Sequence, residues 1–296
     1  MITGAAGMLG SQLLLDAPPG VTAVGTDLRA APEGNPRVAE VGVDLADGAQ
    51  TGALFERVKP TGVIHAAAYT AVDQAETDEE LAYRVNATAT AEVARACQAT
   101  GVPLVVVSTD FVFDGSKRTP YAETDPVAPL GAYGRTKYAG EQAALDAYSE
   151  GTRIVRTQWL YGPRGKHFPG TIVRAGRERG ALKVVDDQIG APTSTLALAP
   201  ALWDVLFAAP PGVYHGACEG QGSWCDFARE CLRLAGIGSV VQLTPCTTDE
   251  FPRPAPRPAY SVLDCSKLTA LRGRTLGDWS SALVTFFEAH GPVGSE

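Results

Sequence analysis

Short apolar runs alternate with amphipathic stretches through the first half of the chain. The runs predict strands at residues 1–3, 21–25, 62–66, 104–107 and 153–156. The stretches between them predict helices that begin near Gly7, Gln50, Glu79 and Pro129. Residues 104–107 are apolar at every position, which suits a strand buried on both faces. Because this alternation is typical of βαβ units, we predict an α/β fold with a Rossmann-type doubly wound parallel sheet.

The regular alternation weakens beyond Trp159, where glycine and proline become frequent. Residues 251–258 contain four prolines and predict an ordered or semi-rigid loop. Further helices are expected near residues 195–207, 224–235 and 276–287. We therefore expect a dinucleotide-binding domain over residues 1–159 and a smaller, mainly substrate-binding region over residues 160–296. This second region would lie over the open end of the sheet, with some segments returning to the first domain.

Composition narrows the class of protein. The chain is 45% hydrophobic over 296 residues, enough for a sizeable core. Its 25 basic and 33 acidic residues give a formal net charge of −8 without any basic run, so we expect no nucleic-acid or membrane partner. The six cysteines form no CxxC pair and no metal-ligand spacing with the four histidines, which predicts reduced thiols and no metal. No signal segment or membrane-length apolar run is visible, so a cytoplasmic location is expected.

Gly4, Gly7 and Gly10 follow the first predicted strand and open an amphipathic stretch. Glycines in this place let the backbone turn tightly and approach a pyrophosphate at a helix N-terminus. Glycine-rich turns without a ligand are also common, so the spacing alone is a weak signal. The position directly after an N-terminal strand favours a dinucleotide.

Acidic residues near the ends of the next apolar stretches bear on the cofactor. Asp27 ends the second predicted strand, where a carboxylate binds adenosine ribose hydroxyls and repels a 2′-phosphate, favouring NADH. Arg29 could instead pair with the 2′-phosphate of NADPH, and a merely solvated aspartate is a third reading. Asp44 could accept a hydrogen bond from the adenine amino group. The predicted cofactor is therefore NADH or NADPH.

Three small side chains, Ala66, Ala67 and Ala68, follow His65 at the end of another predicted strand. Small residues there allow a flat ligand to lie close, although tight helix–sheet packing explains them equally well. His65 itself lies within the apolar run, and we interpret it as a core residue rather than a catalyst.

Tyr133 and Lys137 lie four residues apart on one predicted helix and therefore point the same way. A phenol has a pKa near ~10, and a nearby ammonium would bring that pKa toward the working range. Thr109 follows the strand at residues 104–107, where its hydroxyl could hold a substrate carbonyl oxygen against Tyr133. Serine and threonine are also common strand-end caps. Together with the glycine turn, the three residues predict a reductase.

Six blocks of sequence carry a resemblance to a known family. In chain order they are GAAGMLG, HAAAYTAVDQAE, STDFVFDG, AYGRTKYAGE, RTQWLYG and DDQIGAPTS, spanning residues 4 to 194. The chain resembles the extended short-chain dehydrogenase/reductase superfamily and, more narrowly, the dTDP-4-dehydrorhamnose reductases. The AVDQAE, STDFVF and QIGAPT segments are the more specific to this branch. The resemblance implies NAD(P)H-dependent reduction of the C4 ketone of dTDP-4-dehydro-β-L-rhamnose to dTDP-β-L-rhamnose, and it is compatible with a homodimer.

The resemblance also implies roles for individual residues. Tyr133, Lys137 and Thr109 would be catalytic, with Lys137 also binding the nicotinamide ribose. Thr109, Asp110 and Trp159 would contact the sugar nucleotide. Besides Tyr133 and Lys137, the cofactor would lie along Gly4, Gly7, Met8, Leu9, Asp27, Asp44, Leu45, Ala66, Ala67, Ala68, Tyr69 and Thr70.

Two departures from the family pattern leave the identity of the sugar open. Phe111 stands where many relatives have tyrosine, and residues 166–168 replace an asparagine-containing turn. Some relatives bind magnesium between subunits, but no acidic cluster here indicates that site. One alternative is a reductase of another nucleotide-linked 4-keto-6-deoxyhexose. A second is a non-catalytic regulatory subunit resembling the partner of methionine adenosyltransferase.

Overall fold

Seven parallel strands form the main sheet of the computed structural model, which describes residues 1–31 and 39–291. In spatial order they are β11 (Gly212–His215), β6 (Thr152–Thr157), β5 (Leu104–Thr109), β4 (Val63–His65), β1 (Ile2–Thr3), β2 (Gly25–Asp27) and β3 (Glu40–Val41). The apolar run that predicted a doubly buried strand is β5, near the middle of the sheet. The prediction of an α/β fold with a Rossmann-type sheet is confirmed.

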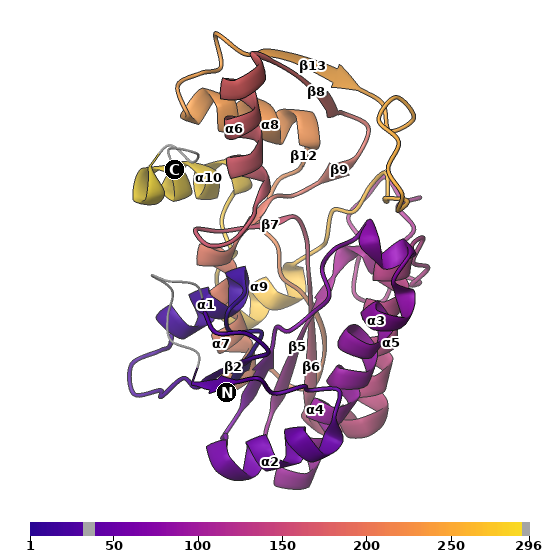
Figure 1. The fold of residues 1–296 in the computed structure, drawn as a ribbon, viewed down its shortest axis with the longest axis vertical. Coiled ribbons are helices and arrows are strands. Elements are labelled where there is room, and N and C mark those ends of the chain that lie inside the picture. The colour runs from indigo at the N-terminus through magenta and orange to yellow at the C-terminus, as the bar shows by residue number, and fades with distance from the viewer. Residues whose placement is uncertain (32–38, 292–296) are drawn as a thin grey trace.

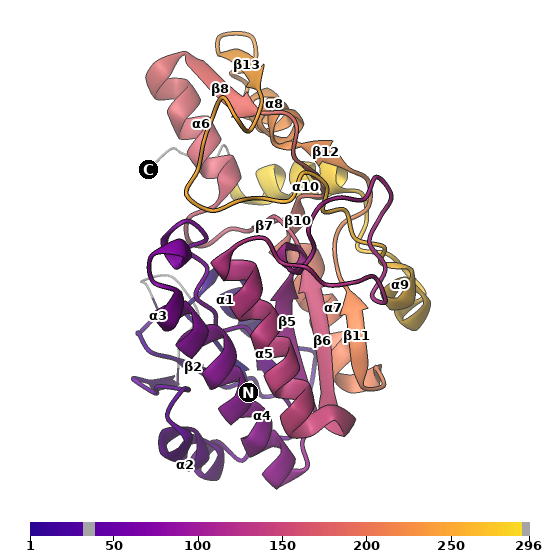
Figure 2. The ribbon, with the colours of Figure 1, turned by 90° about the vertical axis from the view of Figure 1, so that its right-hand side faces the viewer.

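Side chains alternate between the two faces of the strands, and each face buries its own cluster. Ile64, Val105 and Val155 pack on one side with helices α1 (Met8–Leu15) and α7 (Thr195–Ala208). Their neighbours Val63, Val106 and Ile154 pack on the other with α2 (Gly48–Val58), α4 (Ala89–Thr100) and α5 (Ala132–Tyr148). Figure 2 shows α4 and α5 side by side along the second face.

Local signals explain where these helices begin and end. The Asp47 carboxylate accepts hydrogen bonds from the first backbone N–H groups of α2. Gly101 ends α4 in the left-handed region, with φ +69°. Helix α3 (Glu79–Tyr83) runs into α4 through a π-helical turn at Arg84–Thr88. Such turns interrupt the regular hydrogen-bond ladder and often mark functional sites.

A second lobe lies beyond the carboxyl ends of the strands, in the upper part of Figure 1. Its core gathers around Tyr161, Phe227 and Phe286. Its helices are α6 (Phe168–Arg179), α8 (Trp224–Leu234) and α10 (Trp279–His290). Three short strand pairs complete it: β7 (Leu160–Tyr161) with β10 (Thr193–Ser194), β9 (Ile189–Gly190) with β12 (Gly222–Ser223), and β8 (Ala181–Val185) with β13 (Gln242–Cys246).

Three segments of the second half lie on the main sheet rather than in this lobe. Helix α7 packs on the sheet, and β11 forms the edge of the sheet beside β6. Helix α9 (Ser266–Arg272) packs against α7 and β11. None of the helices within the described ranges is long and apolar enough to cross a membrane.

Some predicted boundaries are wrong. The strand expected at residues 21–25 is β2, from Gly25 to Asp27, because its pairing with β1 begins only at Gly25. Val21 and Ala23 are apolar because they pack against the core cluster, not because they belong to the ladder. The helix expected from near Pro129 begins at Ala132, since Gly131 has an extended backbone.

Candidate active site

At two positions of the turn after β1, only glycine fits without a clash. Gly4 has φ +67°, and a Cβ atom there would lie 2.6 Å from the backbone nitrogen of Ala67. A Cβ atom on Gly10 would lie 2.1 Å from the Gly4 carbonyl oxygen. Gly7 is the N-cap of α1 and provides no capping side chain for the first-turn N–H groups. Free N–H groups at a helix N-terminus suit a pyrophosphate, so this turn fits a dinucleotide.

Asp27 and Asp44, the two carboxylates predicted to contact the adenosine half of the cofactor, are both held by hydrogen bonds from the backbone. Asp27 accepts hydrogen bonds from the backbone N–H groups of Ala6, at 3.0 Å, and Arg29, at 3.1 Å. Its position is therefore coupled to the glycine turn. Asp44 accepts from Ala46 at 3.0 Å and forms an ion pair with Arg84 of the π-helical turn. Leu45 beside it is buried.

His65 is a buried structural residue at the end of β4. One ring nitrogen lies 2.8 Å from Oγ1 of Thr3 and the other 3.1 Å from Oγ1 of Thr90. Burial, followed by the charge of Lys137, lowers the pKa of His65 to about 3, so the ring is neutral near pH 7. Thr3 also accepts from the backbone N–H of Ala67 at 3.3 Å, which fixes the alanine segment beside the glycine turn.

Asn86 is a positioning residue that the sequence analysis missed. It lies in the π-helical turn and is almost fully buried. Its Oδ1 accepts from the backbone N–H of Tyr69 at 2.8 Å, and its Nδ2 donates to Thr136 of α5 at 3.0 Å. This side chain therefore joins the segment after β4 to the helix that carries Tyr133 and Lys137. A lone asparagine within an amphipathic stretch gave no signal of the π-helical turn.

Thr109, Tyr133 and Lys137 come together at the carboxyl end of β5. Tyr133 lies half-buried in the first turn of α5, edge-on to the Phe111 ring with centroids 5.5 Å apart. The Thr109 side chain lies close enough to its phenol to influence the phenol pKa. Lys137, one helical turn further, donates from Nζ to the carbonyl oxygen of Val107 at 2.8 Å.

The electrostatics differ from the sequence-based expectation. Burial raises the pKa of Tyr133 to about 12; the Thr109 side chain opposes this rise, and the charge of Asp110 adds to it. Lys137 is bound to the Val107 carbonyl, and burial lowers its own pKa to about 8, with Glu141 opposing. Burial is the largest influence on the phenol pKa, which is therefore raised rather than lowered as the sequence had led us to expect. A phenol that stays protonated near pH 7 suits proton donation, which ketone reduction requires.

Asp110 lies directly after Thr109 and is buried. Its Oδ1 accepts from the Thr109 hydroxyl at 3.0 Å, whereas its Oδ2 has no hydrogen-bond partner among the described residues. Burial raises its pKa to about 7, and the nearby hydroxyls of Ser261 and Thr109 oppose this rise. An unpaired carboxyl oxygen beside Tyr133 can accept a hydrogen bond from a substrate hydroxyl.

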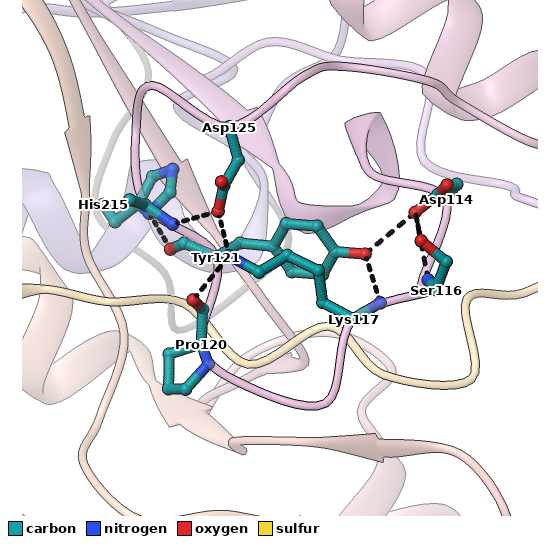
Figure 3. A network of polar contacts seen from close by, with 8 residues as sticks. Asp114, Ser116, Lys117, Pro120, Tyr121, Asp125 and His215 are labelled. Atoms are coloured by element: carbon teal, nitrogen blue, oxygen red, sulfur yellow. Dashed lines mark hydrogen bonds and ion pairs between the residues drawn. The ribbon is translucent and has the colours of Figure 1, made fainter.

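The segment between Asp110 and α5 is held by a polar network, shown in Figure 3. The Tyr121 hydroxyl donates to Asp114 at 2.9 Å, and its ring stacks on Phe113 with centroids 4.2 Å apart. Lys117 forms an ion pair with Asp125. These contacts fix the path of the chain between Thr109 and Tyr133.

Trp159 leaves the end of β6 at the start of the second lobe. Its φ is +46°, a left-handed conformation that is strained for a non-glycine residue and frequent at functional positions. Its ring stacks on Trp224 of α8, with centroids 3.7 Å apart and planes 10° apart. Phe168 of α6 packs on the other ring of this pair, at 4.7 Å.

Two carboxylates of the AVDQAE block tie distant segments to this region. Asp73 accepts from Arg253 at 2.7 Å and from Arg257 at 2.9 Å, both in the proline-rich segment. Glu76 accepts from the backbone N–H of Ala132 at 2.7 Å, at the first residue of α5. The proline-rich segment is therefore fastened beside the helix that bears Tyr133.

Comparisons with known proteins identify the family to which the chain belongs. The model of the family described as "RmlD substrate binding domain" matches residues 1–291. A dTDP-4-dehydrorhamnose reductase of Streptomyces griseus is 39% identical, over 98% of this chain and 93% of its own. A probable dTDP-4,6-dihydroxy-2-methyloxan-3-one 4-ketoreductase of Streptomyces antibioticus is 43% identical, over 97% and 94%.

A solved structure extends the similarity to three dimensions. The crystal structure of dTDP-4-dehydrorhamnose reductase from Bacillus anthracis in complex with NADP has a TM-score of 0.89 at 36% identity, covering 97% of this chain and 98% of that one. The resemblance to dTDP-4-dehydrorhamnose reductases is confirmed, and the chain belongs to the RmlD substrate-binding family of dTDP-4-keto sugar reductases.

Proposed function

We propose that the protein reduces the C4 ketone of dTDP-4-dehydro-β-L-rhamnose to dTDP-β-L-rhamnose, using NADH or NADPH. The observation that carries this proposal is the meeting of Thr109, Tyr133 and Lys137 at the carboxyl end of β5. Ligands of open α/β sheets bind outside the carboxyl ends of the strands. Family membership supports the same class of substrate.

The dinucleotide would be held first by the glycine turn, through Gly4, Gly7, Met8 and Leu9 at the N-terminus of α1. Asp27, Asp44 and Leu45 would contact the adenosine half, and Ala66, Ala67, Ala68, Tyr69 and Thr70 the middle of the cofactor. When bound, the cofactor supplies the hydride that the ketone carbon receives.

The chain's own residues handle the proton and the charge. When the substrate binds, the Thr109 hydroxyl would turn from Asp110 to donate its proton to the ketone oxygen and hold that oxygen near the phenol of Tyr133. Tyr133 donates its proton to the forming alkoxide, and the ammonium of Lys137 stabilises the phenolate that remains. Asp110 and Trp159 orient the sugar nucleotide. General acid help of this kind contributes roughly 10²–10⁴-fold in rate.

A specific observation favours a second candidate, a reductase of another dTDP-linked 4-keto-6-deoxyhexose. The Streptomyces antibioticus relative, whose name gives a different ketosugar, is 43% identical. Phe111, edge-on to Tyr133, also offers no hydroxyl to a bound sugar. The two candidates share the hydride chemistry and differ in the sugar.

Turnover with a panel of substrates tests both candidates. Loss of reduced cofactor is followed with dTDP-4-dehydrorhamnose, dTDP-4-keto-6-deoxyglucose and their uridine- and guanosine-linked counterparts, each with NADH and with NADPH. The proposal predicts the highest kcat/KM for dTDP-4-dehydrorhamnose. A higher value for another dTDP-linked ketosugar selects the second candidate, and no turnover with any of them rejects both.

A further inference from the structure

A buried ion pair lies directly behind Lys137. Glu141 of α5 accepts from Arg156 of β6 through two nitrogens, at 2.9 and 2.7 Å. The side chains of Glu141 and Arg156 are only 1% and 4% exposed. Ser108 of β5 donates its hydroxyl to the same carboxylate. Glu141 is therefore held from two strands at once.

The network continues the row of proposed active-site residues. Tyr133, Lys137 and Glu141 follow one another at intervals of four and share one face of α5. Three consecutive residues of the facing strand β5 lie against these three side chains. Val107 binds Lys137 through its carbonyl, Ser108 binds Glu141, and Thr109 lies against Tyr133. The carboxylate of Glu141 thus fixes α5 against β5 beside Lys137 and Tyr133, the two residues of α5 with a proposed role in the reaction.

Stability alone is a poor explanation for these buried charges. The free energy needed to remove two full charges from water offsets much of their mutual attraction, so a buried ion pair often contributes little net stability. Glu141 also acts on Lys137: burial lowers the pKa of the amine to about 8, and the negative charge of Glu141 opposes that fall. Loss of this charge would leave a larger share of Lys137 neutral near pH 8.

We propose that Glu141 is a positioning residue of the reductase, which fixes Lys137 beside Tyr133 and keeps the lysine in its ammonium form. The inference rests on the proposed function, because a charged lysine matters here for stabilising the phenolate. Glu141 acts through Lys137, and Arg156 and Ser108 act by orienting Glu141.

The other ionisable groups of this region are accounted for. His65 of β4 faces Lys137 and is neutral near pH 7, and Tyr133 on the same helix stays protonated there. Asp110, after β5, lies beside Tyr133. Arg156 of β6 is paired with Glu141. Glu141 is therefore the group through which the charge of Lys137 can be altered without touching the phenol.

The test measures Lys137 directly. The protein is produced with isotope-labelled lysine, the Lys137 resonance is assigned by its absence in Lys137→Met, and its titration is followed by NMR. Glu141→Gln should lower the titration midpoint by roughly one pH unit. The basic limb of the pH–rate profile should move down by the same amount. Glu230→Gln, which breaks an ion pair with Arg233 on α8, is the matched control and should shift neither.

A second variant keeps the proposal testable if Glu141→Gln does not fold. Because Glu141→Gln leaves Arg156 buried and unpaired, the double variant Glu141→Leu with Arg156→Met removes both charges, a change that cores often tolerate. Removal of the Arg156 cation partly offsets the loss of Glu141, so the Lys137 midpoint should fall, but by less than in Glu141→Gln. A lower melting temperature with an unchanged Lys137 midpoint would show a structural role only and overturn the proposal. Since the titration needs no substrate, absent ketosugar turnover by the wild type would reject the proposed function separately.

Discussion

Replacement of Tyr133 by phenylalanine separates the proton donor from the rest of the site. The substitution removes one oxygen and keeps the ring, whose edge-on contact with Phe111 has centroids 5.5 Å apart. Thr109 retains its hydrogen bond to Asp110 at 3.0 Å, so removal of the Tyr133 hydroxyl should cost no more than about 1 kcal/mol of stability. The variant should therefore fold and bind the dinucleotide normally.

Turnover should fall much further than stability. With a pKa of about 12, Tyr133 is almost wholly protonated near pH 7 and can act as the general acid of a reduction. Loss of such a donor should lower kcat by roughly 10²–10⁴-fold, or about 3–5 kcal/mol of transition-state stabilisation.

The assay combines single-turnover oxidation of the reduced cofactor with its binding affinity. Tyr138→Phe makes the same chemical change on the same helix, where Tyr138 packs against the cluster around Phe113, and it serves as the control. The reasoning fails if Tyr133→Phe keeps kcat within about threefold of the wild type, or if the cofactor affinity falls as steeply as the rate.

Three further changes test other parts of the structure. Gly10→Ala would place a Cβ atom 2.1 Å from the Gly4 carbonyl oxygen, so cofactor affinity and melting temperature should both fall, whereas Gly52→Ala in α2, where nothing lies within 4 Å, should leave both intact. Asp27→Asn removes the charge that would repel a 2′-phosphate, and the ratio of kcat/KM for NADPH over NADH should rise about tenfold; an unchanged ratio would contradict the role of this carboxylate. Asp110 has a pKa raised to about 7 by burial, so the folded state binds its proton more tightly and loses stability as the pH rises from about 4 to 7; Asp110→Asn should therefore gain unfolding free energy relative to the wild type across that window, measured by chemical denaturation at several pH values.

The chain's pattern was enough to predict the α/β fold and its strand–helix alternation. The apolar run of β5 and the glycine turn each reflect a local requirement, burial on both faces in one case and close backbone approach in the other. Boundaries were predicted less well. Val21 has the residue type of a strand, but it packs against the core outside the sheet ladder.

Contacts between distant residues had no such local signal. The hydrogen bonds of Asn86 join the segment after β4 to α5, across 50 residues in one case. The ion pair of Asp73 with Arg253 spans a separation of 180 residues. Periodicity reports the environment of one element and cannot name its partner in another. The raised pKa of Tyr133 could not be predicted for the same reason, because it depends on how deeply the folded chain buries the phenol.

The edge strand β11 has a consequence for how the molecule can be divided. It is contributed by Gly212–His215, after the chain has already built part of the second lobe, and it pairs with β6 along four residues. If the polypeptide were cut near residue 160, β6 would become an unpaired edge strand of the N-terminal fragment. The face of the sheet on which α7 packs would also be exposed. We expect neither fragment to be soluble when expressed alone, and the two to regain a cooperative unfolding transition only when produced together.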